Sequence, residues 1–136
     1  MYKLAKTSFL VNELKITKNN LTPGNYQLKP YITRQIGKLK DGVYFTKLLL
    51  SIENSPDSPF PVNVFVDFRG IFEFKDIFDE TKVYDFLKVQ AVQIMYPYLS
   101  SIVTNLSINA MMPPLVLPII DAANLFKHNE ETTYIN

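Results

Sequence analysis

A chain of 136 residues that is 47% hydrophobic is long enough and apolar enough to fold as one domain around a core, which excludes a disordered chain. Its 14 basic and 13 acidic residues give a formal net charge of +1, so the charge balance offers no argument for nucleic-acid binding. The sequence contains no cysteine, which excludes disulfides, thiolate nucleophiles and cysteine-based zinc sites.

The first two predicted elements are strands, over residues 8–16 and 26–36. In the second, Leu28, Pro30 and Ile32 alternate with polar side chains at the period of two that is typical of a half-buried strand. Proline has no N–H to donate to a neighbouring strand. Pro30 therefore indicates that this strand lies at a sheet edge or is broken there.

Two further strands are predicted, over residues 43–53 and 61–68. The first should place five side chains on one face, namely Tyr44, Thr46, Leu48, Leu50 and Ile52. The second should place its valines on one face, namely Val62, Val64 and Val66. Phe65 then points to the other face. Gly70 is expected to mark a bulge or a bend.

A helical pattern begins near Asp79 and carries two apolar stripes at spacings of three and four residues. One stripe comprises Val83, Leu87, Ala91, Ile94, Tyr98 and Ile102. The other comprises Met95, Leu99, Val103, Leu106 and Ala110. One stripe can cover the sheet, and we assign the other to an oligomer interface formed by Met95, Leu99, Val103 and Leu106. Pro97 is expected to kink or split this helix.

The loop after this helix, residues 111–120, is almost wholly apolar, and Pro113 and Pro114 prevent the helix from continuing through it. Loops normally run over the surface and are polar, so an apolar loop must pack on something. The core, a subunit interface and a bound client chain are the three alternatives. A short helix over residues 121–126 and a polar tail are expected to follow.

Strands come first and helices follow, without the alternation that is typical of parallel α/β proteins. The sequence therefore predicts an α+β fold, in which a four-stranded antiparallel sheet is covered by a long C-terminal helix and a short terminal helix. Residues 1–126 are expected to form a single domain, and residues 127–136 a polar C-terminal tail.

Catalytic machinery is not visible in the sequence, which has no nucleophile–base pair, glycine-rich phosphate loop or metal-binding cluster. We therefore expect a protein that is not an enzyme and that uses no cofactor and no metal. The N-terminal residues do not form a signal-peptide apolar run, and no stretch reaches the roughly 18 apolar residues of a membrane span. A cytoplasmic protein without membrane insertion is the expectation.

Several short segments, taken in order, resemble the SecB family of export chaperones between about residues 9 and 126. They are residues 9–16 (FLVNELKI), 41–44 (DGVY), 70–72 (GIF), 96–98 (YPY), 113–118 (PPLVLP) and 124–126 (NLF). These segments are similar to the family's first, third and fourth strands, its long helix, its proline-x-leucine-x-leucine loop and its terminal helix. Their order and spacing together make the resemblance specific.

The resemblance implies a homotetramer, a dimer of dimers packed through the long helices. It also implies an ATP-independent holdase, which binds unfolded polypeptide clients in hydrophobic grooves and serves protein export. In such proteins the groove lies between the second strand, the long helix and the terminal helix. The matching positions here are Leu28, Pro30, Ile32, Leu115, Leu117, Leu125 and Phe126.

This chain departs from the family in its charge, since typical members are strongly acidic. Glu13 keeps one acidic position of the family's motor-binding surface, whereas Thr17 and Phe65 stand where the family has acids. The resemblance thus leaves the SecA motor open as a partner. A SecB-like chaperone dedicated to one client, such as the antitoxin of a toxin–antitoxin system, fits comparably well. A small apolar-ligand carrier and a purely structural adaptor are the alternatives from other classes.

Overall fold

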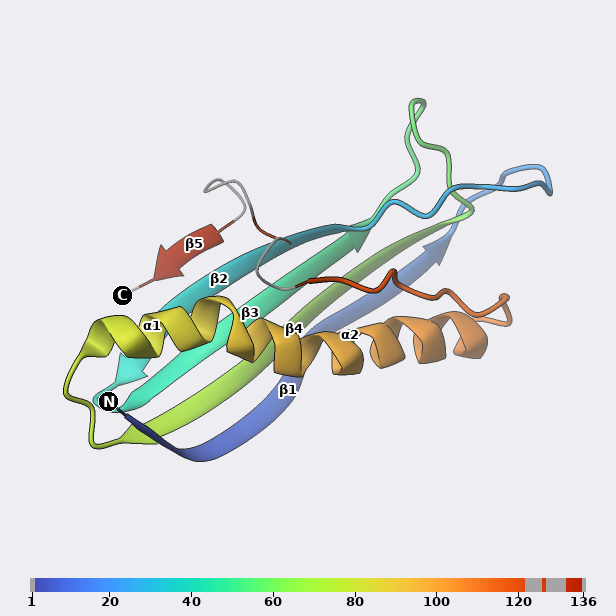
Figure 1. Cartoon of the computed structure of the whole chain (residues 1–136). Coiled ribbons are helices and arrows are strands. Elements are labelled where there is room, and N and C mark those ends of the chain that lie inside the picture. Colours follow the sequence, from blue (N-terminus) through green and yellow to red (C-terminus); the bar gives the residue numbers. More distant parts are fainter. Residues whose placement is uncertain (1, 122–125, 127–131, 136) are drawn as a thin grey trace.

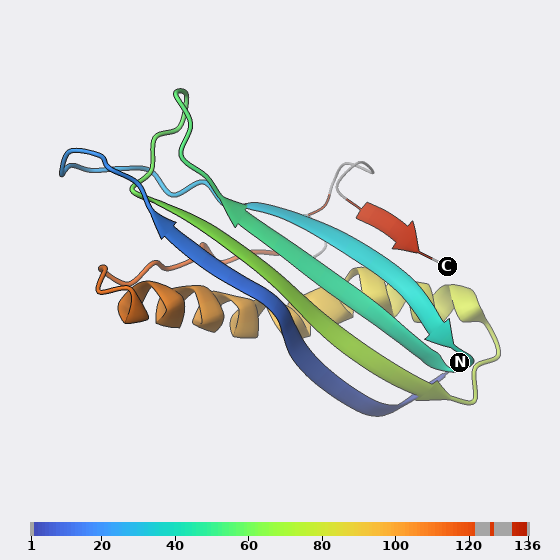
Figure 2. The ribbon, with the colours of Figure 1, turned by 180° about the vertical axis from the view of Figure 1, so that it is seen from behind.

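A computed structural model describes residues 2–121, 126 and 132–135 of the chain. Its elements are β1 (Lys3–Lys18), β2 (Tyr31–Lys40), β3 (Val43–Ile52), β4 (Val62–Lys75), α1 (Glu80–Lys88), α2 (Gln90–Asn109) and β5 (Thr132–Ile135). The sheet has the order β1-β4-β3-β2-β5, with β1 to β4 antiparallel and β5 parallel to β2. Both helices lie across one face of the sheet (Figure 1), and in the described part of the chain nothing crosses the opposite face (Figure 2). The predicted α+β fold is confirmed.

The N-terminal strands differ from their predicted bounds. β1 begins at Lys3 and is longer than expected, whereas β2 begins only at Tyr31. Residues 25–30 form no regular structure, and Pro30 directly precedes the strand. This agrees with the rule that proline cannot donate a hydrogen bond to a neighbouring strand. β5 was not predicted, since residues 127–136 were expected to form only a polar tail.

The inner face of the sheet carries the core, as the period of two predicts. All five expected residues of β3, from Tyr44 to Ile52, are at most 1% exposed, and the three valines of β4 are also buried. Burying a large aliphatic or aromatic side chain stabilises the fold by roughly 1.5–3 kcal/mol, so this layer is a main source of stability.

Gly70 does not mark a bulge in β4, which was the expectation from the sequence. β4 continues through it, and the register shifts lie in β1, between Leu4 and Lys6 and between Val11 and Glu13. An added Cβ at Gly70 would lie 2.8 Å from Sδ of Met95, which is shorter than van der Waals contact. The glycine therefore allows α2 to approach β4 closely.

The helical region is divided at Val89, where φ is −120° and ψ is −62°, and not at Pro97, which lies inside α2. Two side chains of the sheet bind carbonyl groups at this break. Thr46 Oγ1 donates a hydrogen bond to the carbonyl of Leu87 at 3.0 Å, and Arg34 donates one to the carbonyl of Lys88. Carbonyls freed at a helix end need such partners when they are buried.

The assignment of the two helical stripes was wrong in part. Met95, Leu99 and Val103 are at most 1% exposed within the chain itself, so they cover the sheet and cannot form an oligomer interface. Leu106 is half-buried and packs against the same core. The close approach of α2 to β4 at Gly70 explains why this stripe, and not the other, contacts the sheet, because Met95 belongs to it. In the other stripe of α2, Ala91 is also buried, whereas Ile94 and Tyr98 are exposed.

The helix expected over residues 121–126 falls mainly on residues 122–125, which lie outside the described residues. Phe126 is described and is buried, and the guanidinium of Arg34 lies 4.3 Å from the centroid of its ring. A guanidinium over an aromatic face is an attractive cation–π contact. Among the described residues, no helix combines the length and the apolarity that a membrane span requires.

Candidate functional site

The apolar loop after α2 is held as an extended segment beside the helix (Figure 1). Tyr96 donates a hydrogen bond from its hydroxyl to the carbonyl of Pro118 at 2.6 Å, and Thr104 does the same to the carbonyl of Leu115. The backbone N–H of Leu115 donates to Ser107 Oγ at 2.9 Å. These side chains of α2 satisfy part of the loop's polar backbone, which lets an apolar sequence lie against the helix without regular structure.

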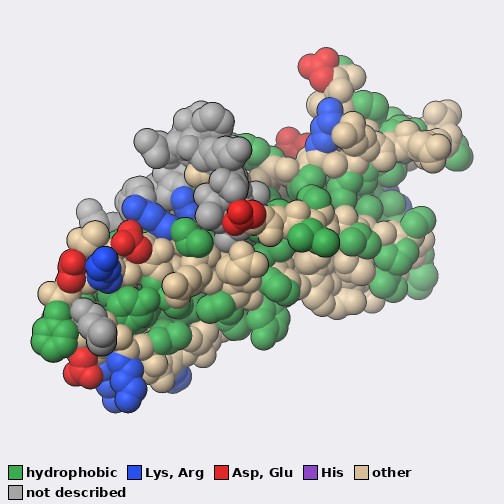
Figure 3. Space-filling view, viewed as in Figure 1, with side chains coloured by type: hydrophobic (Ala, Val, Ile, Leu, Met, Phe, Trp, Pro, Cys, Tyr) green, Lys and Arg blue, Asp and Glu red, His purple; other side chains and the backbone are tan. Residues whose placement is uncertain are grey.

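Side chains of this loop alternate between the core and solvent. Leu115 is half-buried and Leu117 is buried, whereas Val116 is 69% exposed and Ile119 is 100% exposed. Met111, at the start of the loop, is also exposed. Figure 3 shows hydrophobic side chains gathered along α2 and the loop, with many of the charged side chains at the α1 end of this face. We call Met111, Val116 and Ile119 the outer row.

A hollow of about 280 Å³ opens at the start of this loop. Three connecting segments form its walls: the β1–β2 connection, the β3–β4 connection and the start of the apolar loop after α2. The lining residues are Gly24, Asn25, Tyr26, Phe60, Pro61, Met112, Pro113, Pro114 and Leu115. The walls carry no charged side chain, so an apolar group could enter the hollow without removing a charged group from water.

Most of the groove residues predicted from the resemblance lie in one apolar cluster. Ile32, Leu117 and Phe126 are buried in it, and Leu28 and Leu115 pack against it while half-buried. These buried members would form the floor of a groove, and only the half-buried ones are in part accessible. Pro30 is half-buried beside β2, and Leu125 lies outside the described residues.

Sequence reasoning missed the outer row and most of the walls of the hollow. Val116 and Ile119 occupy the solvent side of a segment of which only Leu115 and Leu117 were singled out. In an extended segment alternate side chains face the same side, and this period of two places Val116 on the side opposite to Leu115 and Leu117. No signal in the sequence places Tyr26 or Phe60 beside the loop, because that contact joins distant segments.

The uncovered face of the sheet carries the candidate motor contact. Glu13 pairs with Asp67 in the β1–β4 register, Lys15 pairs with Phe65, and Thr17 pairs with Asn63 on the same face. Asp67 has a side-chain exposure of only 8%, and two cations lie within salt-bridge distance of its carboxylate. Glu13 is thus one acid on a face of mixed charge.

Of the groups with shifted pKa values, Tyr44 and Glu80 lie away from the apolar loop, and Tyr96 donates a hydrogen bond to its backbone. Burial, followed by the hydrogen bond to Glu80, raises the pKa of Tyr44 to about 12. The hydrogen bonds from Tyr44 and Lys38 lower the pKa of Glu80. Burial alone raises the pKa of Tyr96, which holds the loop. In the part of the chain that the structure describes, no three metal-ligating side chains cluster.

Comparison with known proteins agrees with this geometry. The model of the family described as preprotein translocase subunit SecB matches residues 11–133. An uncharacterized protein of Methanocaldococcus jannaschii, MJ0357, is 33% identical over 73 residues, and the match covers 52% of this chain but only 45% of that protein. Less than half of this relative's length is therefore represented here.

A solved structure has the same fold. It is the SecB-like chaperone Rv1957 of Mycobacterium tuberculosis in complex with a ChAD peptide from the HigA1 antitoxin. The TM-score is 0.72 at 11% sequence identity, over 88% of this chain and 90% of the other. At that identity the similarity establishes the fold, while the family model spans most of the chain. The chain belongs to the SecB family.

Proposed function

We propose that this protein is an ATP-independent chaperone that holds unfolded polypeptides against the outer row and the hollow beside it. The observation that carries the proposal is the apolar loop itself, which α2 fixes with its most exposed apolar side chains in solvent. An apolar row kept open on a rigid support is a feature of binding surfaces. Family membership supports the chaperone class.

Capture of a client rests on burial of apolar surface. An extended client segment lays alternate side chains against Val116, Ile119 and the hollow, gaining about 25 cal/mol for each Å² of apolar surface removed from water. Each contact is weak, and many contacts along one client chain raise the affinity through effective concentration. The hollow is open and no larger than about 280 Å³, which favours a peptide side chain over a small-molecule ligand.

Assembly into a homotetramer, a dimer of dimers, is part of the proposal. α2 contains no charged residue over its 20 residues, although Ile94, Tyr98 and Ile108 on its outer side are 40–54% exposed. A surface helix normally carries charges on its solvent side. Charge depletion with exposed aromatic and aliphatic side chains is typical of a protein interface. The proposed subunit interface is therefore the outer side of α2, and not the stripe of Met95, Leu99, Val103 and Leu106.

The kind of client is the more specific part of the proposal. The fold is shared with a chaperone whose structure holds an antitoxin peptide, which supports a dedicated client of this kind. General export with the SecA motor is the alternative, and Glu13 with Thr17 and Phe65 on the sheet face supports only weak docking of SecA. Calorimetric titration with SecA separates the two, and tight salt-sensitive binding would contradict the dedicated role. A cytoplasmic location goes with either role.

The outer row can be tested by substitution, because its members are exposed and can be changed without disturbing the core. We expect the double variant Val116→Asp, Ile119→Asp to suppress aggregation of a chemically unfolded model protein about tenfold less effectively, since a client would have to desolvate two unpaired charges. ATP should make no difference.

The matched control is Phe78→Asp, since Phe78 is 84% exposed in the connection before α1. This variant should protect the client as well as the parent protein does. Equal protection by the parent and the double variant would show that clients bind elsewhere.

A further inference from the structure

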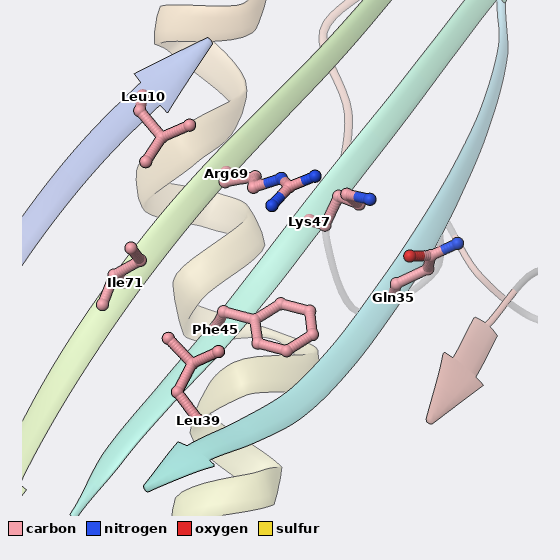
Figure 4. A pocket seen from close by; sticks show the side chains of 7 residues that line it. All are labelled: Leu10, Gln35, Leu39, Phe45, Lys47, Arg69 and Ile71. Atoms are coloured by element: carbon pink, nitrogen blue, oxygen red, sulfur yellow. The ribbon is translucent and has the colours of Figure 1, made fainter. Parts of the chain in front are cut away.

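The uncovered face of the sheet contains a second hollow, of about 250 Å³, on the side opposite to α2 (Figure 4). Four strands contribute to it. The lining residues are Leu10, Gln35, Leu39, Phe45, Lys47, Arg69 and Ile71. Leu10 is 41% exposed and Leu39 is 55% exposed, so the apolar walls of the hollow are open to solvent. The role proposed above for the apolar loop does not use this hollow.

Two neighbouring rungs of the sheet line the hollow, and the first of them is apolar. In the β2–β3 register Phe45 pairs with Gly37, and in the β3–β4 register it pairs with Ile71. The rung across β4, β3 and β2 at Phe45 therefore reads Ile71, Phe45, Gly37, with no side chain at its β2 end. Gly42 is the glycine with positive φ in the described chain, so Gly37 is not there for a left-handed backbone. Gly37 is buried and is not among the lining residues, so at this rung the hollow is bounded by Phe45 and Ile71.

The neighbouring rung brings two cations side by side. Lys47 pairs directly with Arg69, and Gln35 continues the rung on β2. Figure 4 shows Arg69, Lys47 and Gln35 in one row beside the apolar side chains. Like charges directly opposite each other in a sheet are destabilising, so this pair needs an anion. Asp67 supplies one carboxylate, with its oxygens 3.6 Å from Lys47 Nζ and 3.5 Å from Arg69 Nε.

That carboxylate balances only one of the two positive charges. Its side chain is 8% exposed and also accepts a hydrogen bond from Asn12 at 3.2 Å, so it lies beneath the two cations. The side chain of Arg69 is 34% exposed and that of Lys47 is 18% exposed. The rim of the hollow therefore carries one excess positive charge beside an apolar cavity.

Several other charged groups of this face lie on rungs to either side of this pair. Lys6 pairs with Glu73 in the β1–β4 register, so these two balance each other. Glu13 is next to Asp67 and is followed on the same side of β1 by Lys15, which has the opposite sign. None of these pairs removes the excess charge at Lys47 and Arg69.

We propose that this hollow docks a partner polypeptide segment in which an acidic side chain stands next to a large apolar one. The apolar side chain fills the hollow between Leu10, Phe45 and Ile71, and the carboxylate sits between Lys47 and Arg69. A volume of about 250 Å³ is below the range of small-molecule pockets and suits a single anchoring side chain. Four apolar lining residues make a nucleic-acid phosphate a poor occupant.

The site lies on the opposite side of the sheet from the groove for unfolded clients, so one subunit can hold both at once (Figure 2). The charge requirement is the reverse of the acidic surface that the resemblance assigns to the motor contact. A partner with an acidic and apolar docking segment would thus bind this chain and would not bind a SecB whose sheet face is acidic.

Fluorescence anisotropy with the full-length protein tests the proposal. The probe is a fluorescein-labelled, end-capped peptide of sequence GSELFDEGS, and the matched peptide replaces its three acids with the corresponding amides. We expect the acidic peptide to bind about tenfold more tightly, and this advantage to shrink as salt is raised. Equal affinity for the two peptides would overturn the proposal.

Two variants separate the cavity from the charge. Leu10→Ala with Leu39→Ala removes two exposed apolar walls of the hollow, and Lys47→Gln with Arg69→Gln removes the cations; each pair should weaken binding of the acidic peptide about tenfold. The groove variant Val116→Asp, Ile119→Asp should bind the peptide like the parent, so loss of client protection leaves this result unchanged. Unaltered binding by the Leu10→Ala, Leu39→Ala variant would overturn the assignment.

Methyl NMR spectra of the unmodified protein test the same proposal without a substitution, so a folding defect cannot cause the result. Adding the acidic peptide should shift Leu10, Leu39 and Ile71 and leave Val116 and Ile119 in place. Shifts confined to the loop would contradict the proposal. Loss of self-association in the Leu10→Ala, Leu39→Ala variant without peptide would contradict it too, because the occupant would then be a second copy of the chain.

Discussion

The hydroxyl of Tyr44 is buried beneath the start of α1, where it donates a hydrogen bond to the carboxylate of Glu80. Lys38 Nζ lies 2.9 Å from the same carboxylate, so β2 and β3 together hold the first turn of the helix. An acid in the first turn of a helix also interacts favourably with the helix dipole. This small cluster positions α1, and through α1 the break and α2.

The pKa of Tyr44 gives the cluster a measurable pH dependence. Burial and the bond to Glu80 raise this pKa from its usual 10.0 to about 12, so the folded protein keeps a proton that the unfolded chain releases. The resulting stability is fully present below pH 10 and is lost as the pH rises to about 12. We expect the melting temperature to fall more steeply between these pH values in the parent than in Tyr44→Phe. Parallel curves would contradict this role.

The faces of the strands could be predicted at the residue scale, because a period of two is a strong signal. Each even-numbered residue of β3 from Tyr44 to Ile52 is buried, as expected. The role of Gly70 could not be predicted, since the atom it accommodates is the sulfur of Met95, which is 25 positions away in the sequence. A glycine in a strand indicates a bulge or a close approach, and sequence alone does not separate these.

At the scale of elements, the division between α1 and α2 is the feature that the sequence did not reveal. Pro97 is the obvious helix breaker, yet it lies within α2, and the break occurs at Val89. The cause is tertiary, because Thr46 and Arg34 bind the carbonyls of Leu87 and Lys88 from the sheet below. The two apolar stripes could not be assigned for the same reason: their spacings are equal, and only contact with β4 distinguishes them.

Thr46→Val tests the anchoring of this break. The substitution keeps the shape of the side chain and removes the donor to the carbonyl of Leu87, which leaves a buried acceptor unpaired. We expect the free energy of unfolding to fall by about 1–3 kcal/mol, measured by urea denaturation at a fixed protein concentration. Thr33→Val, at a half-buried position of β2, is the control and should have little effect. A loss of the same size in both variants would argue against the hydrogen bond as the cause.

At the scale of the whole molecule, the sheet separates two different surfaces. The helix side presents an uncharged α2 and the apolar loop, whereas the uncovered side presents charges interspersed with leucine, isoleucine and phenylalanine. The resemblance assigns the client groove to the helix side through Leu115 and Leu117, and that assignment stays a prediction. The second surface was not predicted, since its hollow is lined by residues from four strands that are far apart in the sequence.

Oligomerisation through α2 is testable on the same scale. Ile94→Glu with Tyr98→Glu places two charges on the exposed side of the helix, and charges at the centre of an interface must be desolvated on association. We expect sedimentation at micromolar concentration to give a tetramer for the parent and smaller species for this variant. Phe78→Glu, exposed and away from α2, should leave the tetramer intact. A monomeric parent would contradict the assembly.

The central claim is that unfolded polypeptide binds along the apolar loop. Photo-crosslinking tests it most directly, with benzoylphenylalanine incorporated in turn at Ile119, at Phe78 and at Leu39, all of which are exposed. A fluorescently labelled unfolded client is then added without ATP and irradiated. We predict a strong crosslinked band from position 119 and weak bands from positions 78 and 39. Equal bands from all three positions, or a dominant band from position 39, would contradict the account.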